Sequence, residues 1–335
     1  MQLPIRVLGF LLFSLLATAH ADTILLNNGD RLSGKIVLID SGKLLLKTNY
    51  AGTISIATSK ITSIETQNAM QVREDRFKEP LVSILQPSTE GSVLLAVQQA
   101  DVAITDIYQA TPVAEQKALA DWVWSGNIDL SGDFKRKESS SDNYEIDLQT
   151  ELRHSHWRHN AELSYDYETK DDSKKTDTFM ASYTLDRFFS ERWFWQAKYR
   201  FNYDGLEDLR KQHLLGTGPG FQFWDDSLGS LSMSALFNHS QFQYEDGHKE
   251  RFQSATWNWD YRRFFWARTL EFYNKAEIGI PFTSDISYVL DAETGLRYRL
   301  NSWASLSLRA EWDKVRSRFG NLNERRYLIG VGVNW

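Results

Sequence analysis

The last eleven residues of the chain, 325–335, have the sequence RRYLIGVGVNW and decide the fold. From Tyr327 onward every second side chain is apolar, and from Gly330 onward the residues between them are glycine or asparagine. The apolar set is Tyr327, Ile329, Val331, Val333 and Trp335. Side chains of a β-strand point alternately to its two faces, so this period of two predicts a strand with one apolar face and one polar face.

The same period of two extends upstream from this strand as far as Asp121. It occurs in twelve runs, near residues 121–135, 143–154, 157–169, 176–187, 192–204, 212–224, 228–243, 251–262, 269–281, 286–300, 303–314 and 325–335. The links between runs alternate between charged segments and short aromatic ones, and tryptophans gather at the short links. An even number of amphipathic strands with aromatic residues at both ends is typical of a bacterial outer-membrane barrel. The sequence therefore predicts an all-β protein in which residues 121–335 form a 12-stranded antiparallel transmembrane β-barrel.

The composition of the 335-residue chain supports this division and excludes several protein classes. All 12 tryptophans lie after Asp121, whereas residues 22–120 hold only three aromatic side chains, Tyr50, Phe77 and Tyr108. The absence of cysteine excludes a disulfide scaffold and a cysteine-ligated metal. The net charge of −6, with no basic face, excludes nucleic-acid binding.

The segments before the barrel are expected to be an export signal, a small domain and a linker. Residues 1–21 are predicted to be a signal peptide, because a basic start precedes a short apolar stretch and Ala19-His20-Ala21 is a small-x-small cleavage pattern. Residues 22–110 are predicted to form a small periplasmic SH3-like β module, since Asn27-Asn28-Gly29 favours a tight turn between short apolar runs. Residues 111–120 are interpreted as a linker.

The terminal strand also suggests how the barrel reaches the membrane. Many bacterial outer-membrane proteins end in an apolar strand with an aromatic last residue, which the barrel assembly machinery recognises. We therefore interpret Tyr327, Ile329, Val331, Val333 and Trp335 as an assembly signal. The alternative is an ordinary terminal strand of a secreted β-sandwich.

Three stretches together resemble a known family. The opening at residues 22–34, DTILLNNGDRLSG, the segment at residues 216–221, GTGPGF, and the terminal strand are similar to those of the salt-induced outer-membrane proteins (YdiY-like). The resemblance covers most of the chain after the signal peptide. This family has no established activity, so the resemblance implies a location and a fold rather than a reaction.

The polar faces of the first three predicted barrel strands form an acidic wall. Eight carboxylates stand there against two arginines, Arg153 and Arg158; the acidic wall comprises Asp129, Asp133, Glu145, Asp147, Glu151, Glu162, Asp166 and Glu168. The polar faces of the other strands carry both charges in similar number. In a wide channel the acidic wall would favour cations. In a narrow one these carboxylates would pair with cations across the lumen and close it.

The charged links at the other end of the predicted strands carry a basic rim. Its lysines and arginines are expected to bind lipopolysaccharide phosphates; they are Lys135, Arg136, Lys137, Lys174, Lys175, Arg316 and Arg318. No residues combine a nucleophile, a base and an orienting group, so we predict no catalytic, cofactor or metal site and no enzyme activity.

The leading functional hypothesis is a narrow, weakly cation-preferring pore or an envelope-maintenance barrel in the outer membrane. The alternatives are a non-conducting anchor that presents the N-terminal module to a periplasmic partner and, third, an outer-membrane lipid hydrolase. The expected partners are outer-membrane lipid, lipopolysaccharide, the barrel assembly machinery and a periplasmic partner of the module.

Overall fold

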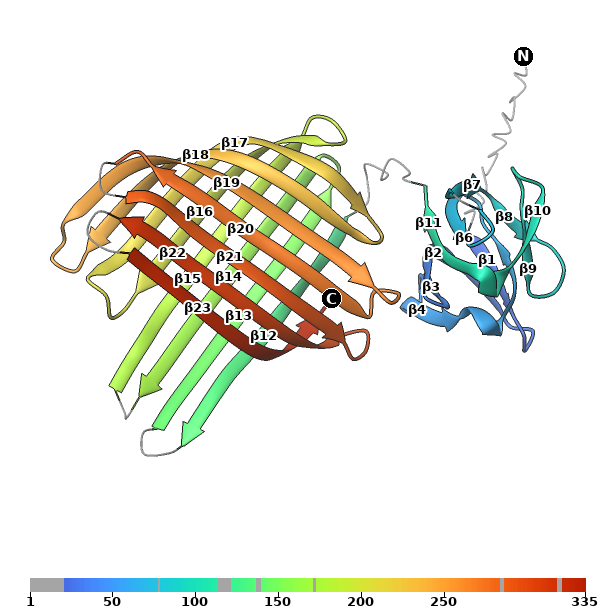
Figure 1. The fold of residues 1–335 in the computed structure, drawn as a ribbon, viewed down its shortest axis with the longest axis horizontal. Helices are drawn as coiled ribbons and strands as arrows, with labels where there is room; N and C mark the ends of the chain where they lie inside the picture. Colours follow the sequence, from blue (N-terminus) through green and yellow to red (C-terminus); the bar gives the residue numbers. More distant parts are fainter. Residues whose placement is uncertain are drawn as a thin grey trace, which may run out of the picture.

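The computed structural model contains a small β module and a barrel, and almost every described residue outside the turns is in a strand (Figure 1). It describes residues 21–77, 79–113, 122–136, 140–170, 173–283, 286–317 and 321–335. The predicted signal peptide, except Ala21, and most of the predicted linker lie outside these residues. None of the described segments is a helix long and apolar enough to cross a membrane.

The N-terminal module consists of two sheets around one aliphatic core. The larger sheet has the order β4-β3-β2-β11-β6-β7, and β1 pairs with both β2 and β5; the smaller sheet has the order β10-β9-β8. The elements are β1 (Asp22–Leu26), β2 (Arg31–Asp40), β3 (Lys43–Thr48), β4 (Gly52–Ala57), η1 (Thr58–Lys60), β5 (Ile61–Glu65), β6 (Met70–Glu74), β7 (Leu81–Ser83), β8 (Leu85–Pro87), β9 (Ser92–Leu95), β10 (Ala100–Ala103), η2 (Ile104–Asp106) and β11 (Ile107–Pro112). The core side chains alternate along these strands, as at Ile36, Leu44 and Leu46. The all-β nature of the module is confirmed, and its SH3-like form stays a prediction.

The C-terminal part is a closed barrel in which each strand pairs with its neighbours in the chain. The described residues form β12 (Val123–Arg136), β13 (Ser140–His154), β14 (Trp157–Lys170), β15 (Ser173–Phe188), β16 (Trp193–Asp204), β17 (Leu209–Asp226), β18 (Gly229–Tyr244), β19 (Lys249–Phe265), β20 (Leu270–Pro281), β21 (Ile286–Arg299), β22 (Ala304–Ser317) and β23 (Asn321–Asn334). The prediction of twelve antiparallel strands is therefore confirmed. The strand ends differ from the predicted ones by a few residues, because ladder pairing continues into the charged links that the pattern assigned to loops.

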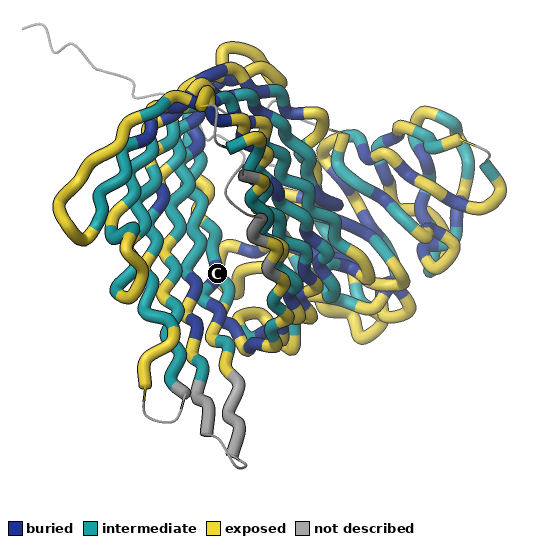
Figure 2. The backbone as a smooth tube through the Cα atoms, turned by 60° about the vertical axis from the view of Figure 1, so that its left-hand side comes forward, coloured by how far each residue is buried: buried dark blue, intermediate teal, exposed yellow. Residues whose placement is uncertain are grey.

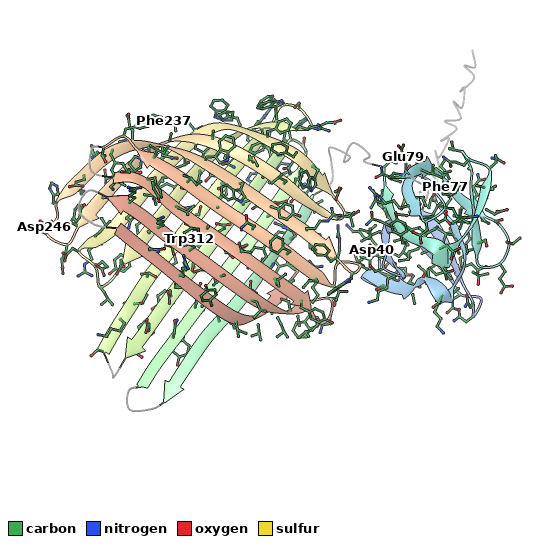
Figure 3. All side chains as sticks on the ribbon, in the orientation of Figure 1. Asp40, Phe77, Glu79, Phe237, Asp246 and Trp312 are labelled. Carbon is green, nitrogen blue, oxygen red and sulfur yellow. The ribbon has the colours of Figure 1, made fainter. Side chains whose placement is uncertain are left out.

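The two faces of the barrel strands have opposite character. Large apolar side chains on the outer face are exposed, among them Phe237 and Trp312, which Figure 3 labels on the barrel wall. Charged and polar side chains on the inner face are buried or half-buried, and Figure 2 shows that most residues of the barrel strands are of intermediate burial, with exposed residues at many of the turns. The barrel is therefore polar inside and apolar outside.

The seam between the first and last strands closes the barrel. β12 and β23 pair antiparallel over five residue pairs, from Asn127 with Asn334 to Ser131 with Gly330. The backbone N–H groups of Gly126 and Trp335 each donate to the carbonyl of the other residue, at 3.2 and 3.1 Å. The Trp335 ring lies against Gly126, where an added Cβ would overlap it. β13 and β14, for comparison, share fourteen residue pairs, so the seam is short.

The module contacts the barrel at two turns next to β18 and β20. Leu38 and Leu45 of the module form a small buried apolar cluster with Leu228 and Ala267 of these turns. The backbone N–H of Ala267 donates to Asp40 Oδ2 at 2.7 Å, and Figure 3 shows Asp40 on the side of the module that faces the barrel. We call this contact the docking contact and the adjacent end of the barrel the module-side mouth.

Candidate functional site in the barrel lumen

The polar faces of the barrel strands enclose a cavity of about 640 Å³. Strand alternation places these side chains inside, and hydrogen-bonded closure around the ring keeps them away from the apolar outer face. Fourteen carboxylate residues and nine arginines or lysines line the cavity. The described lining is thus rich in charge and acidic on balance.

Half of the acidic wall, four of its eight carboxylates, pairs with arginines on strands across the closing seam. Arg309 of β22 binds Glu145, and its Nη1 lies 2.6 Å from Asp147 Oδ2. Arg297 Nη2 lies 2.8 Å from Asp129 Oδ2. Arg326 Nη1 of β23 lies 2.6 Å from Asp166 Oδ2, and its Nη2 lies 2.7 Å from Glu311 Oε2. Barrel closure brings these groups together, because β21 to β23 and β12 to β14 are neighbours only through the seam.

The remaining residues of the acidic wall have different surroundings. Glu162 pairs with Lys275 as described below, and Glu168 also has an interaction partner. Glu151 lines the cavity with no carboxylate–cation pair to any described residue. The side chain of Asp133 lies outside the described residues. The structure therefore places five of the eight carboxylates along one wall of the cavity, namely Glu145, Asp147, Glu151, Glu162 and Asp166.

Two sets of ion pairs cross the lumen. Lys275 Nζ of β20 lies 3.0 Å from Glu162 Oε1 of β14. These strands are six positions apart in a ring of twelve, so they face each other across the barrel. Lys198 Nζ and Arg200 Nη2 of β16 lie 2.5 and 3.0 Å from Glu277 Oε2 of β20. We call these five residues, Glu162, Lys198, Arg200, Lys275 and Glu277, the cross-lumen bridge, and all of them line the cavity.

The module-side mouth carries further buried charges. Arg158 Nη2 lies 2.7 Å from Asp186 Oδ2, and Arg158 Nη1 donates to Gln222 Oε1 at 2.7 Å. Arg153 of β13 binds Asp225 at the end of β17. These contacts tie β13, β14, β15 and β17 together, and they hold side chains in place beside the opening.

The rim and the terminal strand lie where the strand pattern puts them, as far as they are described. Lys174, Lys175 and Arg316 are exposed, and Lys174 Nζ lies 3.1 Å from Asp177 Oδ2. The side chains of the other four rim residues, Lys135, Arg136, Lys137 and Arg318, lie outside the described residues. The five apolar side chains of the terminal strand all point outward and are 40–78% exposed.

Sequence analysis missed two functional features. One is the docking contact, for which the signal is the run Ile36-Val37-Leu38-Ile39, where four apolar residues in a row interrupt the alternation of β2. The other is a pair of arginines, Arg268 and Arg299, at the module-side mouth. The pairing of β20 with β21 brings these two arginines to the same end of the barrel, and no local pattern in the sequence indicates this.

Comparisons with known proteins give a family and several solved barrels. The model of the family described as "Protein of unknown function, DUF481" matches residues 128–335. No curated protein matches the chain. Solved structures that it resembles include the NanC porin, at 11% identity over 62% of this chain and 98% of that one, with a TM-score of 0.41. The KdgM porin in complex with disordered oligogalacturonate matches at 12% identity over 62% and 98%, with a TM-score of 0.35. The CymD monoaromatic hydrocarbon channel matches at 7% identity over 79% and 85%, with a TM-score of 0.33.

Proposed function

This chain belongs to the DUF481 family, whose function is unknown, and from that premise we propose that it is a narrow, weakly cation-preferring pore of the outer membrane. The apolar outer face supports the membrane location. Exposed side chains such as Leu215, Ile280 and Leu308 surround the barrel, and in water so large an apolar surface would aggregate. A closed barrel satisfies its backbone hydrogen bonds internally, which is what hydrocarbon requires.

The single observation that carries the proposal is the acidic balance of the enclosed cavity. Fourteen carboxylates against nine cationic side chains give its described lining a net negative charge. Low-dielectric walls focus such a charge on a permeating ion, so cations are favoured over anions. The ion pair between Lys275 and Glu162 spans the lumen between opposite strands, which supports a narrow pore with low conductance.

The orientation of the protein follows from its two ends. The chain enters β12 and leaves β23 at the module-side mouth, where Trp335 lies next to Trp124 with ring centroids 5.8 Å apart. Aromatic residues of this kind anchor strands at a membrane interface. We infer that this end faces the periplasm, that the module lies there, and that the barrel assembly machinery recognises the terminal strand. The exposed Lys174, Lys175 and Arg316 then lie at the outer surface and contact lipopolysaccharide.

Ion conduction across planar lipid bilayers tests the proposal. In a tenfold KCl gradient, the reversal potential should have the sign of a cation-preferring pore. Glu151→Gln should reduce that potential, because Glu151 is the member of the acidic wall that lines the cavity without a salt bridge to any described residue; Arg158 and Arg262 act on it only electrostatically. Asp246→Asn is the matched control, since Asp246 is exposed in the turn after β18, at the other end of the barrel (Figure 3).

The cross-lumen bridge also favours a second function, a non-conducting anchor that presents the module to a periplasmic partner. The double variant Lys275→Met/Glu162→Gln separates the two functions, because it removes both charges of one bridge and leaves neither unpaired. A pore should conduct in the wild-type form and conduct more in the double variant. The absence of ion conduction in both the wild type and the double variant would overturn the pore and favour the anchor.

A further inference from the structure

Two arginines at the module-side mouth lack the carboxylate partners that the other lumen arginines have. Arg268 lies in the turn between β19 and β20, and Arg299 is the last residue of β21. Their guanidinium carbons lie 5.1 and 5.5 Å from the centre of the same ring, Phe264. Among the described residues, neither arginine forms an ion pair with a carboxylate. Arg299 and Phe264 line the lumen cavity, so this pair faces the interior of the barrel.

Glu271, the carboxylate that acts electrostatically on both arginines, is already shared by two other arginines. Glu271 Oε2 lies 3.2 Å from Arg297 Nη1, and Glu271 Oε1 lies 3.5 Å from Arg262 Nε. Arg268 uses its Nε to donate to the carbonyl of Ser227 at 2.8 Å, which fixes the side chain without neutralising it. The Nε of Arg299 is buried and has no hydrogen-bond partner. Asp226 also acts electrostatically on Arg268, but neither Asp226 nor Glu271 forms an ion pair with Arg268 or Arg299 among the described residues. Within the described part of the chain, the two guanidiniums therefore lack a salt-bridge partner in a lumen that is acidic on balance.

The environment of Arg268 reflects its burial and the nearby positive charge of Arg299. Burial and the neighbouring charge of Arg299 lower the pKa of the Arg268 guanidinium to about 10. A folded-state pKa below the ordinary value means that Arg268 stays charged at neutral pH at a cost to stability, and a bound anion would reduce that cost. Half-buried side chains of this kind remain accessible to a small ligand.

We propose that Arg268 and Arg299 form a binding site for a small multivalent anion that carries phosphate or carboxylate groups. Guanidinium groups present several N–H donors in a plane and bind such groups bidentately. Two guanidiniums beside one aromatic ring match a ligand with two anionic groups better than a monovalent ion. The site opens to the lumen cavity, which favours a soluble anion over a lipid headgroup. This site is additional to the cation preference of the pore and does not depend on conduction.

Calorimetric titration of the detergent-solubilised full-length protein with inorganic pyrophosphate tests the site, with chloride at equal ionic strength as the screening control. We expect saturable binding to the wild type and a loss of affinity of about tenfold in Arg299→Gln, the size expected for one charge-assisted contact. Arg268→Gln should act in the same direction. Arg325→Gln is the matched control, because Arg325 is exposed and stacks on Trp312 at the outer face. Its affinity should stay within about twofold of the wild type, as expected for an unrelated surface charge.

Each outcome decides the proposal. No binding to the wild type, or equal affinities in Arg299→Gln and Arg325→Gln, would overturn it. Heat-modifiable mobility on a gel verifies that each variant is folded, and Arg268→Gln serves if Arg299→Gln fails to fold. Mixed micelles with phosphatidylglycerol distinguish the source of the phosphate: competition there would assign the site to lipid and overturn the soluble ligand. Binding without conduction would overturn the pore and leave the anion site standing.

Discussion

In the N-terminal module the fully buried side chains are aliphatic, such as Ile24, Leu44 and Ile64, whereas in the barrel most buried side chains are polar or charged. Both regions are built from strands that alternate with period two. The module points its apolar face inward, and the barrel points it outward. The alternation of apolar and polar residues therefore determines where the strands form, whereas the surrounding solvent, water or lipid, determines which face becomes the interior. In the module the hydrophobic effect acts within the chain, while in the barrel it acts between the chain and the lipid.

The largest expected effect comes from removing core volume in the module. Leu44→Ala should destabilise the module by about 2–5 kcal/mol, because Leu44 is fully buried and its loss leaves a cavity. Faster hydrogen exchange in residues 43–48 would report this, and tryptophan fluorescence would report the barrel alone, since all 12 tryptophans lie there. Loss of barrel folding in the same variant would show that the two regions do not fold independently.

A smaller effect, different in size between the two regions, is expected from placing a charge on an exposed apolar residue. Leu308→Arg on the outer face of β22 should destabilise the barrel by about 2–4 kcal/mol, as for arginine near the bilayer midplane. Val82→Arg in the module, where Val82 is exposed to a similar degree, should change stability by less than about 0.5 kcal/mol. The two variants are compared by their folded fractions after refolding into lipid vesicles. Gel mobility before and after heating measures these fractions. Equal folded fractions would mean that the outer face does not meet lipid.

The smallest effect concerns the docking contact between the two regions. Trp266, Ala267 and Arg268 have φ values of 51°, 50° and 61°, a left-handed conformation that costs non-glycine residues about 1–3 kcal/mol each. Asp40 accepts the N–H of Ala267 within this turn. Asp40→Ala should weaken the contact by about 1–3 kcal/mol, the range for a hydrogen bond to a charged group.

Hydrogen exchange of residues 266–268 measures this contact and should become faster in Asp40→Ala. Glu79→Ala, at an exposed position elsewhere on the module (Figure 3), is the control and should leave the exchange unchanged. Unchanged exchange in Asp40→Ala would show that the turn keeps its conformation without the module.

The twelve barrel strands could be predicted because each amphipathic run carries its own period, and Tyr327 to Trp335 repeats it most regularly. The acidic wall could be predicted for the same reason. The cross-lumen bridge could not, because which strand faces Lys275 depends on the number of strands and on closure. The docking contact depends on packing between segments far apart in the chain, as Asp40 and Ala267 show.

Proline in β17 is an intermediate case. The sequence favours a local bulge or bend at Pro219, since proline cannot donate to the ladder. In the structure Pro219 keeps its pairing with Trp195 of β16. The ladder to β18 omits Gly218 and Pro219 and resumes in the same register at Gly220. The missing N–H of Pro219 therefore removes two residue pairs from the ladder between β17 and β18, and the register of these strands is the same before and after the gap.

The short seam between β12 and β23 determines where the barrel wall opens most easily under mechanical load. A cylinder under radial load opens along its weakest line. Here five residue pairs join β12 to β23, whereas fourteen join β13 to β14 and fifteen join β18 to β19. Local opening is easiest where the fewest hydrogen bonds must break together. Swelling of the membrane or the lumen would therefore concentrate at this line. Arg309 and Arg326 form ion pairs across this line with carboxylates of β13 and β14. These side-chain contacts resist opening together with the backbone hydrogen bonds of the seam.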